Sequence, residues 1–434
     1  MTEWRKIQID KLCTIVKGQT GLAKATPGKY PLVTTGHKKK TCNEYQFNTK
    51  AVCIPLVSST GHGKKTLNYV HYQDGKFALG TILAAVIPKD DEELDAKYLH
   101  LYLTFYKDRV LVPLMRGAAN VSLSIKDIKK IYIPVPSIDI QKLIIAKYYK
   151  IKPGSDELLE IINHQSKCFK QLHQVILQEA AEGKLTADWR KKHPELINGE
   201  NNAENLLKKI KIEKEQLIKE KKITKQKPLP PISEEEKPFK LPKSWIWCRL
   251  GSFGFTQTGT TPPTSNKSNF GDFIPFITPE DISGNGINYK KRGLSKIGIL
   301  KSRLILNNSV LMVCIGGSIG KCYFTDKNVC CNQQINAVTP FYLSEKILFY
   351  MMISPLFQKQ LSDKAMKSST PILNKSKWEN LLLPLPPFIE QQIIIKRLED
   401  ILNIIEQLEK QASERKEQTN QLMYSVLREA FEQK

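Results

Sequence analysis

Residues 123–136 read LSIKDIKKIYIPVP, and residues 373–386 read LNKSKWENLLLPLP. The first leucine and both prolines of these two stretches match at an offset of 250 residues. The same offset holds far downstream, where Leu172 corresponds to Leu422. A single register kept over such a distance indicates an internal repeat, so we expect two copies of one structural unit.

The first part of each copy corresponds less closely. Residues 4–7 resemble residues 247–250. Two loop pairs follow, namely residues 18–21 with 257–260 and residues 59–64 with 316–321. Loop lengths and side chains differ here, which suggests that a variable globular region precedes a well-matched helical region in each copy. This arrangement is typical of a protein in which two recognition domains of different specificity share one helical framework.

The helical half of each copy has apolar residues at alternating spacings of four and three, which is typical of a coiled coil. We expect the two helices to pack on each other through Leu158, Ile162, Phe169, Leu172, Ile176, Leu398, Ile401, Ile405, Leu408, Leu422 and Val426. The alternative is that each helix packs on its own globular domain. Pro153 and Gly154 predict an interruption of the first helix, with Ser155 capping its restart.

Composition limits the class of protein. The chain has 434 residues, of which 41% are hydrophobic, and this is enough for at least two domains with real cores. No run approaches the ~18 apolar residues that a bilayer span needs. The first residues lead into no apolar segment of the kind that marks a secretory signal. We therefore expect a cytoplasmic protein.

The charge of the chain is strongly positive, with 66 Lys and Arg residues against 43 Asp and Glu residues and a formal net charge of +23. Such a field attracts polyanions, and nucleic acid is the commonest of these. The alternative is a lysine-rich composition that only keeps the protein in solution. Basic clusters at residues 37–40, 62–65 and 290–292 lie in loop-like stretches, which favours phosphate contact.

The sequence contains no complete motif for a catalytic or nucleotide-binding site. Residues 317–321 resemble a phosphate-binding loop, but Ile315 and Cys322 stand where that motif needs Gly and Ser or Thr. The acidic pair at residues 280–281 is interpreted as charge at the start of a helix rather than a nuclease centre. The nine cysteines lack metal-ligand spacing, so we expect small core residues and no metal site. The sequence predicts a binding module without catalytic residues.

Three motifs resemble those of the specificity subunits of type I restriction-modification systems. Residues 384–392, PLPPFIEQQ, resemble the Pro-x-Pro-x-x-x-Glu-Gln-Gln start of that family's conserved helix. Residues 181–190 resemble its Gly-Lys-Leu-Thr-x-x-Trp-Arg run, and residues 241–250 resemble the Leu-Pro-x-x-Trp opening of a target recognition domain. The resemblance covers essentially the whole chain. The first copy departs from it at residues 138–141, where Gln141 alone matches.

The resemblance implies a mixed α/β fold in which two similar target recognition domains are joined by two long helices, packed as an antiparallel coiled coil with an internal pseudo-two-fold repeat. The expected segments are residues 1–137 (first target recognition domain), 138–185 (first spacer helix region), 186–242 (charged helix and Pro-rich linker), 243–387 (second target recognition domain) and 388–434 (second spacer helix). The helix within residues 201–224 is either a solvated surface helix or a docking element for another subunit.

The resemblance also implies partners. Each domain is expected to read one half of a split, asymmetric sequence in double-stranded DNA. The long helices are expected to dock two methyltransferase (modification) subunits, which methylate adenine and carry restriction and translocase subunits. S-adenosylmethionine, ATP and Mg²⁺ are expected on those partners, and no cofactor is expected on this chain. No membrane partner is expected.

Loops between the matched elements are the candidates for DNA contact. Base edges are read by Arg, Lys, Asn, Gln, Ser or Thr, whereas Lys on phosphates positions the domain. In the first domain the candidates are Lys17, Gln19, Lys38, Lys39, Lys40, Ser58, Ser59, Thr60, His62, Lys64, Arg116 and Asn120. In the second they are Thr258, Thr260, Ser265, Lys267, Lys290, Arg292, Ser318, Lys321, Lys367, Ser368 and Thr370.

Two other functions remain open from the sequence. A self-sufficient DNA nuclease or modification enzyme with an unrecognised active centre would act on DNA alone with Mg²⁺. A scaffold that joins protein partners would touch no DNA, and the basic loops speak against it.

Overall fold

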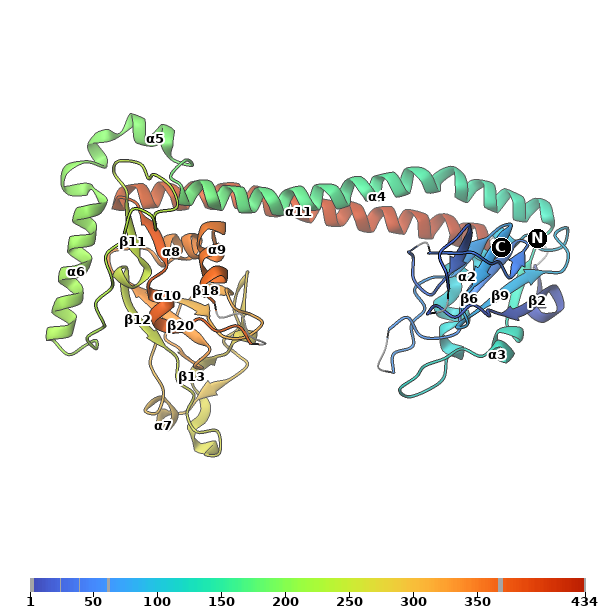
Figure 1. Cartoon of the computed structure of the whole chain (residues 1–434), viewed down its shortest axis with the longest axis horizontal. Coiled ribbons are helices and arrows are strands. Elements are labelled where there is room, and N and C mark those ends of the chain that lie inside the picture. Colours follow the sequence, from blue (N-terminus) through green and yellow to red (C-terminus); the bar gives the residue numbers. More distant parts are fainter. Residues whose placement is uncertain (1–3, 24, 39, 61–62, 366–369, 433–434) are drawn as a thin grey trace. The chain divides into compact units, whose positions relative to one another are not determined.

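Figure 1 shows the computed structural model, which describes residues 4–23, 25–38, 40–60, 63–365 and 370–432. Its internal contacts divide the chain into two units. Unit 1 comprises residues 1–164 and 412–434, and unit 2 comprises residues 165–411. The two longest helices, α4 (Ile138–Ala181) and α11 (Phe388–Phe431), each contribute to both units. The segments expected from the sequence instead placed each long helix in a segment of its own.

The internal repeat is confirmed by the bounds of the helices and strands. In the first copy, α3 (Ile125–Lys129) and β10 (Tyr132–Val135) precede α4. In the second copy, α10 (Lys375–Glu379) and β21 (Leu382–Leu385) precede α11, with every bound shifted by 250 residues. The N-caps match as well, because the Ser124 and Asn374 side chains accept hydrogen bonds from backbone N–H groups three residues on.

Unit 1 is built from short strands that lie beside one helix. One four-stranded sheet has the order β2 (Cys13–Lys17), β9 (Leu83–Pro88), β6 (Ala51–Pro55), β7 (His71–Gln73). The other has the order β4 (Lys40–Cys42), β3 (Tyr30–Val33), β8 (Lys76–Leu79), β5 (Phe47–Asn48). A separate ribbon joins β1 (Arg5–Gln8) to β10, beside α1 (Ile9–Leu12). Helix α2 (Ala96–Val110) contacts β6 and β7.

Unit 2 repeats this arrangement with additions. Its four-stranded sheet has the order β12 (Gly254–Thr258), β20 (Ile335–Pro340), β17 (Val310–Val313), β18 (Cys322–Phe324). A three-stranded sheet has the order β16 (Gly293–Leu294), β13 (Phe270–Ile277), β19 (Cys330–Cys331). The remaining elements are β11 (Ile246–Arg249), β14 (Ile282–Ser283), β15 (Gly286–Ile287), α5 (Ala187–Lys192), α6 (Ala203–Lys219), α7 (Lys296–Ile299), α8 (Glu345–Ile353) and α9 (Pro355–Lys364).

The fold is therefore mixed α/β, as the sequence predicted. Each unit has its own buried core. Tyr98 and Ile54 are fully enclosed in unit 1, and Trp378 and Phe357 are fully enclosed in unit 2. Among the described residues, none of the helices is apolar and long enough to cross a membrane.

The opening strands of the two copies correspond differently from the sequence interpretation. Arg5 pairs with Val135 in unit 1, and Ile246 pairs with Leu385 in unit 2. Since Val135 and Leu385 are equivalent, the partner of Trp4 is the tryptophan at position 245 and not the one at 247. A shift of two residues keeps every strand side chain on the same face, so the sequence pattern alone did not expose it.

The two long helices pack side by side (Figure 1). On α11 the buried positions Leu398, Ile405, Ala412 and Thr419 are seven residues apart, and Ile162 is buried on α4. Half-buried positions are Phe169, Ile176, Ile401 and Val426. The exposed fractions of Leu158, Leu172, Leu408 and Leu422 are 43%, 41%, 38% and 54%. These four side chains stay partly exposed, whereas Ile162, Leu398 and Ile405 of the expected seam are buried.

Helix α4 is continuous through Pro153, which corrects the expected interruption. A proline in a helix interior removes one hydrogen bond and costs roughly 3 kcal/mol. Packing along a long neighbouring helix offsets this local preference. Ser155, expected as a cap, is instead a buried residue within the helix.

Helix α6 and the segment after it pack on unit 2. Ala203, Leu206 and Ile210 of α6 belong to the core of that unit. Lys214 Nζ donates hydrogen bonds of 2.9 and 3.0 Å to the carbonyl oxygens of Gly251 and Gly254, and burial lowers its pKa to about 8. The expected charged helix thus uses one face to contact its own chain.

Candidate nucleic-acid interface

Unit 1 brings together three basic loops that are far apart in the sequence. The His37 ring stacks on Tyr69 with a centroid distance of 5.4 Å. Asn68 precedes Tyr69, and its backbone N–H donates to Ser59 Oγ at 2.8 Å. The Ser58 backbone N–H in turn donates to the Val121 carbonyl oxygen at 2.9 Å. The loops near residues 37, 59 and 121 therefore form one continuous surface.

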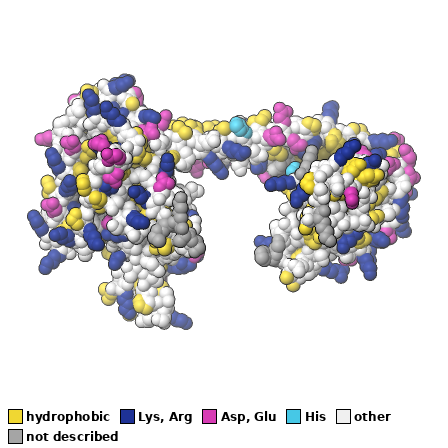
Figure 2. Space-filling model, viewed as in Figure 1, with side chains coloured by type: hydrophobic (Ala, Val, Ile, Leu, Met, Phe, Trp, Pro, Cys, Tyr) yellow, Lys and Arg dark blue, Asp and Glu magenta, His cyan; other side chains and the backbone are white. Residues whose placement is uncertain are grey.

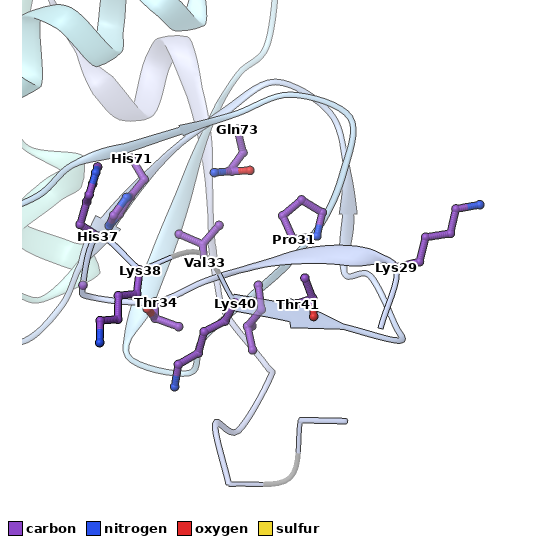
Figure 3. Close-up of a pocket in the computed structure, with 12 residues that line it drawn as sticks. Lys29, Pro31, Val33, Thr34, His37, Lys38, Lys40, Thr41, His71 and Gln73 are labelled. Carbon is purple, nitrogen blue, oxygen red and sulfur yellow. The ribbon is translucent and has the colours of Figure 1, made fainter. Parts of the chain in front are cut away.

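A cavity of about 430 Å³ lies in this surface, beside β3, β4 and β7. Figure 3 shows residues that line it. Lys29, Lys38 and Lys40 lie around it, and their ammonium groups supply positive charge. The Gln73 amide points into the cavity from β7. His71 also lines it, and burial, together with the neighbouring His100 and His37, lowers the pKa of its imidazole. A neutral histidine adds no charge, so the lysines determine the electrostatics here.

Unit 2 joins its candidate loops through the turn between β19 and β20. Thr261 Oγ1 donates to Gln333 Oε1 at 2.6 Å, and the Cys314 backbone N–H donates to the Gln334 carbonyl oxygen at 2.8 Å. The Gly316 backbone N–H donates to the Pro371 carbonyl oxygen at 2.9 Å. Loops near residues 260, 316 and 371 thus meet around this turn.

Equivalent backbone contacts hold the loops in place within each of the two units. Gly18 N–H donates to the Leu83 carbonyl oxygen at 2.9 Å, and Gly259 N–H donates to that of Ile335 at 3.0 Å. A Cβ atom on Gly18 would lie 2.1 Å from the Gly80 carbonyl oxygen. The equivalent distance from Gly259 to the Asn332 carbonyl oxygen is 2.2 Å. The loops around Gly18 and around Gly259 therefore have the same backbone arrangement but carry different side chains. We call this arrangement the shared backbone frame.

Further pairs extend this frame. Leu56 N–H donates to the Ile82 carbonyl oxygen as Cys314 N–H does to that of Gln334, each at 2.8 Å. Ser58 and Gly316 are equivalent through their bonds to Val121 and Pro371. The sequence comparison had matched the first glycine loops two residues out of step and the second loops one residue out of step, because loop lengths differ between the copies.

The described candidate residues all lie at the surface, exposed or half-exposed. Lys17 and Gln19 are exposed on a loop that the Gln46 amide holds through the backbone. Arg116 has 81% of its side chain exposed and lies 3.7 Å from Asp127. The remaining exposed candidates are Lys38, Lys40, Thr60, Lys64, Asn120, Ser265, Lys267, Lys290, Arg292, Lys321 and Thr370, and the half-exposed ones are Ser58, Ser59, Thr258, Thr260 and Ser318.

Several candidates already have partners within the protein. Ser58 Oγ donates to the Lys64 carbonyl oxygen at 2.6 Å, which fixes its own loop. Arg292 forms an ion pair of 3.2 Å with Glu280 and donates to Thr278 at 3.0 Å. Hydrogen bonds from Lys291 and Arg292 lower the pKa of the Glu280 carboxyl group. These side chains position the surface before any ligand binds. Lys39, His62, Lys367 and Ser368 lie outside the described residues.

Sequence reasoning missed the polar residues of strands and short turns. Gln73 on β7 and the run from Asn332 to Gln334 were not among the candidates. Neither stands in a basic cluster, which was the signal used. The position of residues 332–334 next to Gly259, which is equivalent to Gly18, follows only from the paired strands.

Across the described ranges, no three His, Cys, Asp or Glu side chains are grouped to hold a metal ion. Asp281 accepts hydrogen bonds from the Thr278 backbone N–H and hydroxyl group, so it caps a short helix, whereas Glu280 pairs with Lys291 and Arg292. Eight of the nine cysteines are buried and Cys168 is exposed. Figure 2 shows Lys and Arg side chains spread over the visible face of both units.

A duplicated frame with variable polar loops, joined to paired long helices, defines a two-domain recognition protein. A family model described as the type I restriction modification DNA specificity domain matches residues 1–151 and 242–415. The chain belongs to this family.

Curated relatives agree with this assignment. The specificity subunit of the type I restriction enzyme EcoAI from Escherichia coli is 33% identical over 256 residues, which is 55% of this chain and 40% of the relative. That of EcoDI, also from Escherichia coli, is 20% identical over 99% of this chain and 88% of the relative. The match therefore spans less than half of the EcoAI subunit. These relatives are named as specificity subunits of restriction enzymes.

A solved structure shows the same fold. It comes from work on complex assembly and conformational transition of the type I R-M system. Its chain aligns with a TM-score of 0.67 and 15% identity, covering 99% of this chain and 98% of the other.

Proposed function

We propose that this chain is the DNA-recognition subunit of a type I restriction-modification complex and that each unit reads one half of a bipartite, asymmetric target. The observation that carries the proposal is the shared backbone frame of the two units with different side chains on it. One frame gives both units the same way of approaching a duplex, and different side chains give them different base preferences.

Charge supports DNA as the ligand. Lysines around the unit 1 cavity and on the loops of both units suit contact with phosphates, which supplies affinity without sequence information. Polar side chains between them can meet base edges in the major groove. The units thus combine both kinds of contact that specific DNA recognition requires.

The proposal extends to partners. The outer faces of α4 and α11 dock two adenine-methyltransferase subunits, and restriction subunits join through them. S-adenosylmethionine, ATP and Mg²⁺ bind to those partners. The adenine to be methylated leaves the duplex for the methyltransferase subunit rather than for this chain.

A genome-wide map of adenine methylation tests the proposal. The chain is expressed with its methyltransferase partner, and the map is repeated without the chain. The expected result is a split motif, two short blocks separated by unread bases, that disappears when the chain is omitted. An unchanged map, from a complex shown to assemble by co-purification, would contradict the proposal.

A further inference from the structure

The turn between β19 and β20 occupies the centre of the unit 2 surface. It comprises residues 332–334 and lies between the loop at Gly259 and the loop that begins at Cys314. The equivalent turn in unit 1 comprises residues 80–82, between Gly18 and Leu56. The backbone contacts on both sides are the same, so the two turns occupy one position of the shared frame.

The side chains on these two turns differ completely. Unit 1 has Gly80, Thr81 and Ile82, whereas unit 2 has Asn, Gln and Gln at residues 332–334. Thr81 and Ile82 are exposed, and so is Gln333. At this position the backbone is the same in both units and the exposed side chains differ. Such a position can give the two units different base preferences.

The amides of the unit 2 turn are held in place by their neighbours. Thr261 Oγ1 donates to Gln333 Oε1 at 2.6 Å, which leaves one lone pair of that oxygen. Within the described part of the chain, the Gln333 Nε2 amino group makes no hydrogen bond. Asn332 Nδ2 donates to Gln334 Oε1 at 2.9 Å. The Gln333 amide is therefore oriented and still has both a donor and an acceptor to offer.

This combination suits one kind of base edge. A glutamine amide can bond bidentately to adenine, donating to N7 and accepting from the N6 amino group. Prior orientation by Thr261 lowers the entropy lost when the contact forms. In unit 1, the methyl groups of Thr81 and Ile82 suit apolar contact with the thymine methyl group instead.

We propose that Gln333 is a specificity-determining residue that reads an adenine in the half-site of unit 2, with Thr261 positioning its amide. The inference rests on the proposed function, since it names one base contact within the interface assigned there. It concerns only one of the two half-sites, which makes the other half-site an internal reference.

The test compares methylation motifs and initial methylation rates of complexes that contain the wild-type chain, Gln333→Ala or Gln333→Glu. Gln333→Ala is expected to relax one adenine position in one half-site, lowering discrimination there by about tenfold to a hundredfold. Gln333→Glu is expected to shift that position towards cytosine, whose N4 amino group donates to a carboxylate. The other half-site and the gap length are expected to stay unchanged.

Gln216→Ala is the matched control, because Gln216 is an exposed glutamine of unit 2 on α6. It is expected to leave the motif unchanged. Co-purification with the methyltransferase and the melting temperature establish that each variant assembles. An unchanged motif in both Gln333 variants overturns the inference while the proposed function stands. Loss of specificity at both half-sites also overturns it, because that result indicates a structural role. A wild-type complex without any split motif contradicts the proposed function instead.

Discussion

Nε1 of Trp245 donates a 2.8 Å hydrogen bond to Oε2 of Glu390, whose side chain is fully buried. Oε1 of the same carboxylate accepts a hydrogen bond from Thr186 at 2.6 Å and pairs with Arg190. The start of α11 is thus locked to the segment that follows α4. The equivalent residue of the first copy is Ile140, which is 36% exposed, so the two copies share helix bounds but not this network.

Glu390→Ile, which introduces the residue of the first copy, is expected to destabilise unit 2 by about 3–5 kcal/mol, because it leaves Arg190 and Trp245 without their acceptor. Urea unfolding of the full chain measures this loss. Glu399→Ala removes an exposed ion pair with Lys346 and is expected to cost at most about 1 kcal/mol. Equal losses in the two variants would show that the buried network has no special role.

Gly18→Ala and Gly259→Ala test the shared backbone frame. Each Cβ atom would lie within 2.2 Å of a carbonyl oxygen, so the strands must shift. Each substitution is expected to cost about 1–3 kcal/mol. Gly284→Ala, where no atom lies within 4 Å of the added Cβ, is the control and is expected to be nearly neutral. The melting temperatures of the three variants measure these costs. If Gly18→Ala or Gly259→Ala leaves the melting temperature unchanged, the claim that both glycines make the same close backbone contact is wrong.

Two half-buried histidines make the stability of unit 1 depend on pH. Burial lowers the pKa of His71 and of His100, so the unfolded chain binds protons more readily than the folded chain. Stability is therefore full above the unfolded value of 6.5 and falls as the pH drops towards the folded values. Between about pH 7.5 and pH 5.5, the melting temperature of the His71→Gln variant is expected to fall less than that of the wild type. The control is His173→Gln, on α4, whose melting temperature is expected to change with pH as that of the wild type does. If the His71→Gln variant also shows the wild-type change, His71 is not the cause of the pH dependence.

The lysines on the loops of the unit 1 surface are expected to supply affinity but no sequence information. Replacing Lys38, Lys40 and Lys64 by Gln is expected to weaken DNA binding of the assembled complex and to lower its salt-dependence slope by about 1 for each lost phosphate contact. The methylation motif is expected to remain the same. Binding titrations at several salt concentrations measure the slope. The same replacement at Lys208, Lys209 and Lys219 of α6 is the control, and an equal effect there would argue for nonspecific charge.

The sequence predicted the repeat and its helical half well, because matched prolines and apolar spacings report local backbone preferences directly. The 250-residue register recurs in every bound from α3 to α4 and from α10 to α11. The continuity of α4 through Pro153 could not be predicted, because packing on a neighbouring helix overrides a local penalty.

The candidate interface was predictable only in part. Charge clusters in the sequence located the loops near residues 37, 60 and 116, and a ring-stacking contact and loop hydrogen bonds bring them together. The turn with Gln333 carries no charge and follows two buried cysteines, so no sequence signal marked it. Its significance comes from the equivalence of Gly18 and Gly259, which requires the paired strands to be seen.

Exchange of one target recognition domain tests the central claim most directly. Residues 243–387 are replaced by the equivalent segment of the EcoDI specificity subunit, and the adenine methylation motif of the resulting complex is mapped. If each unit reads one half-site, one block of the split motif changes while the other block is kept. A motif that changes in both blocks, or in neither, would contradict the account.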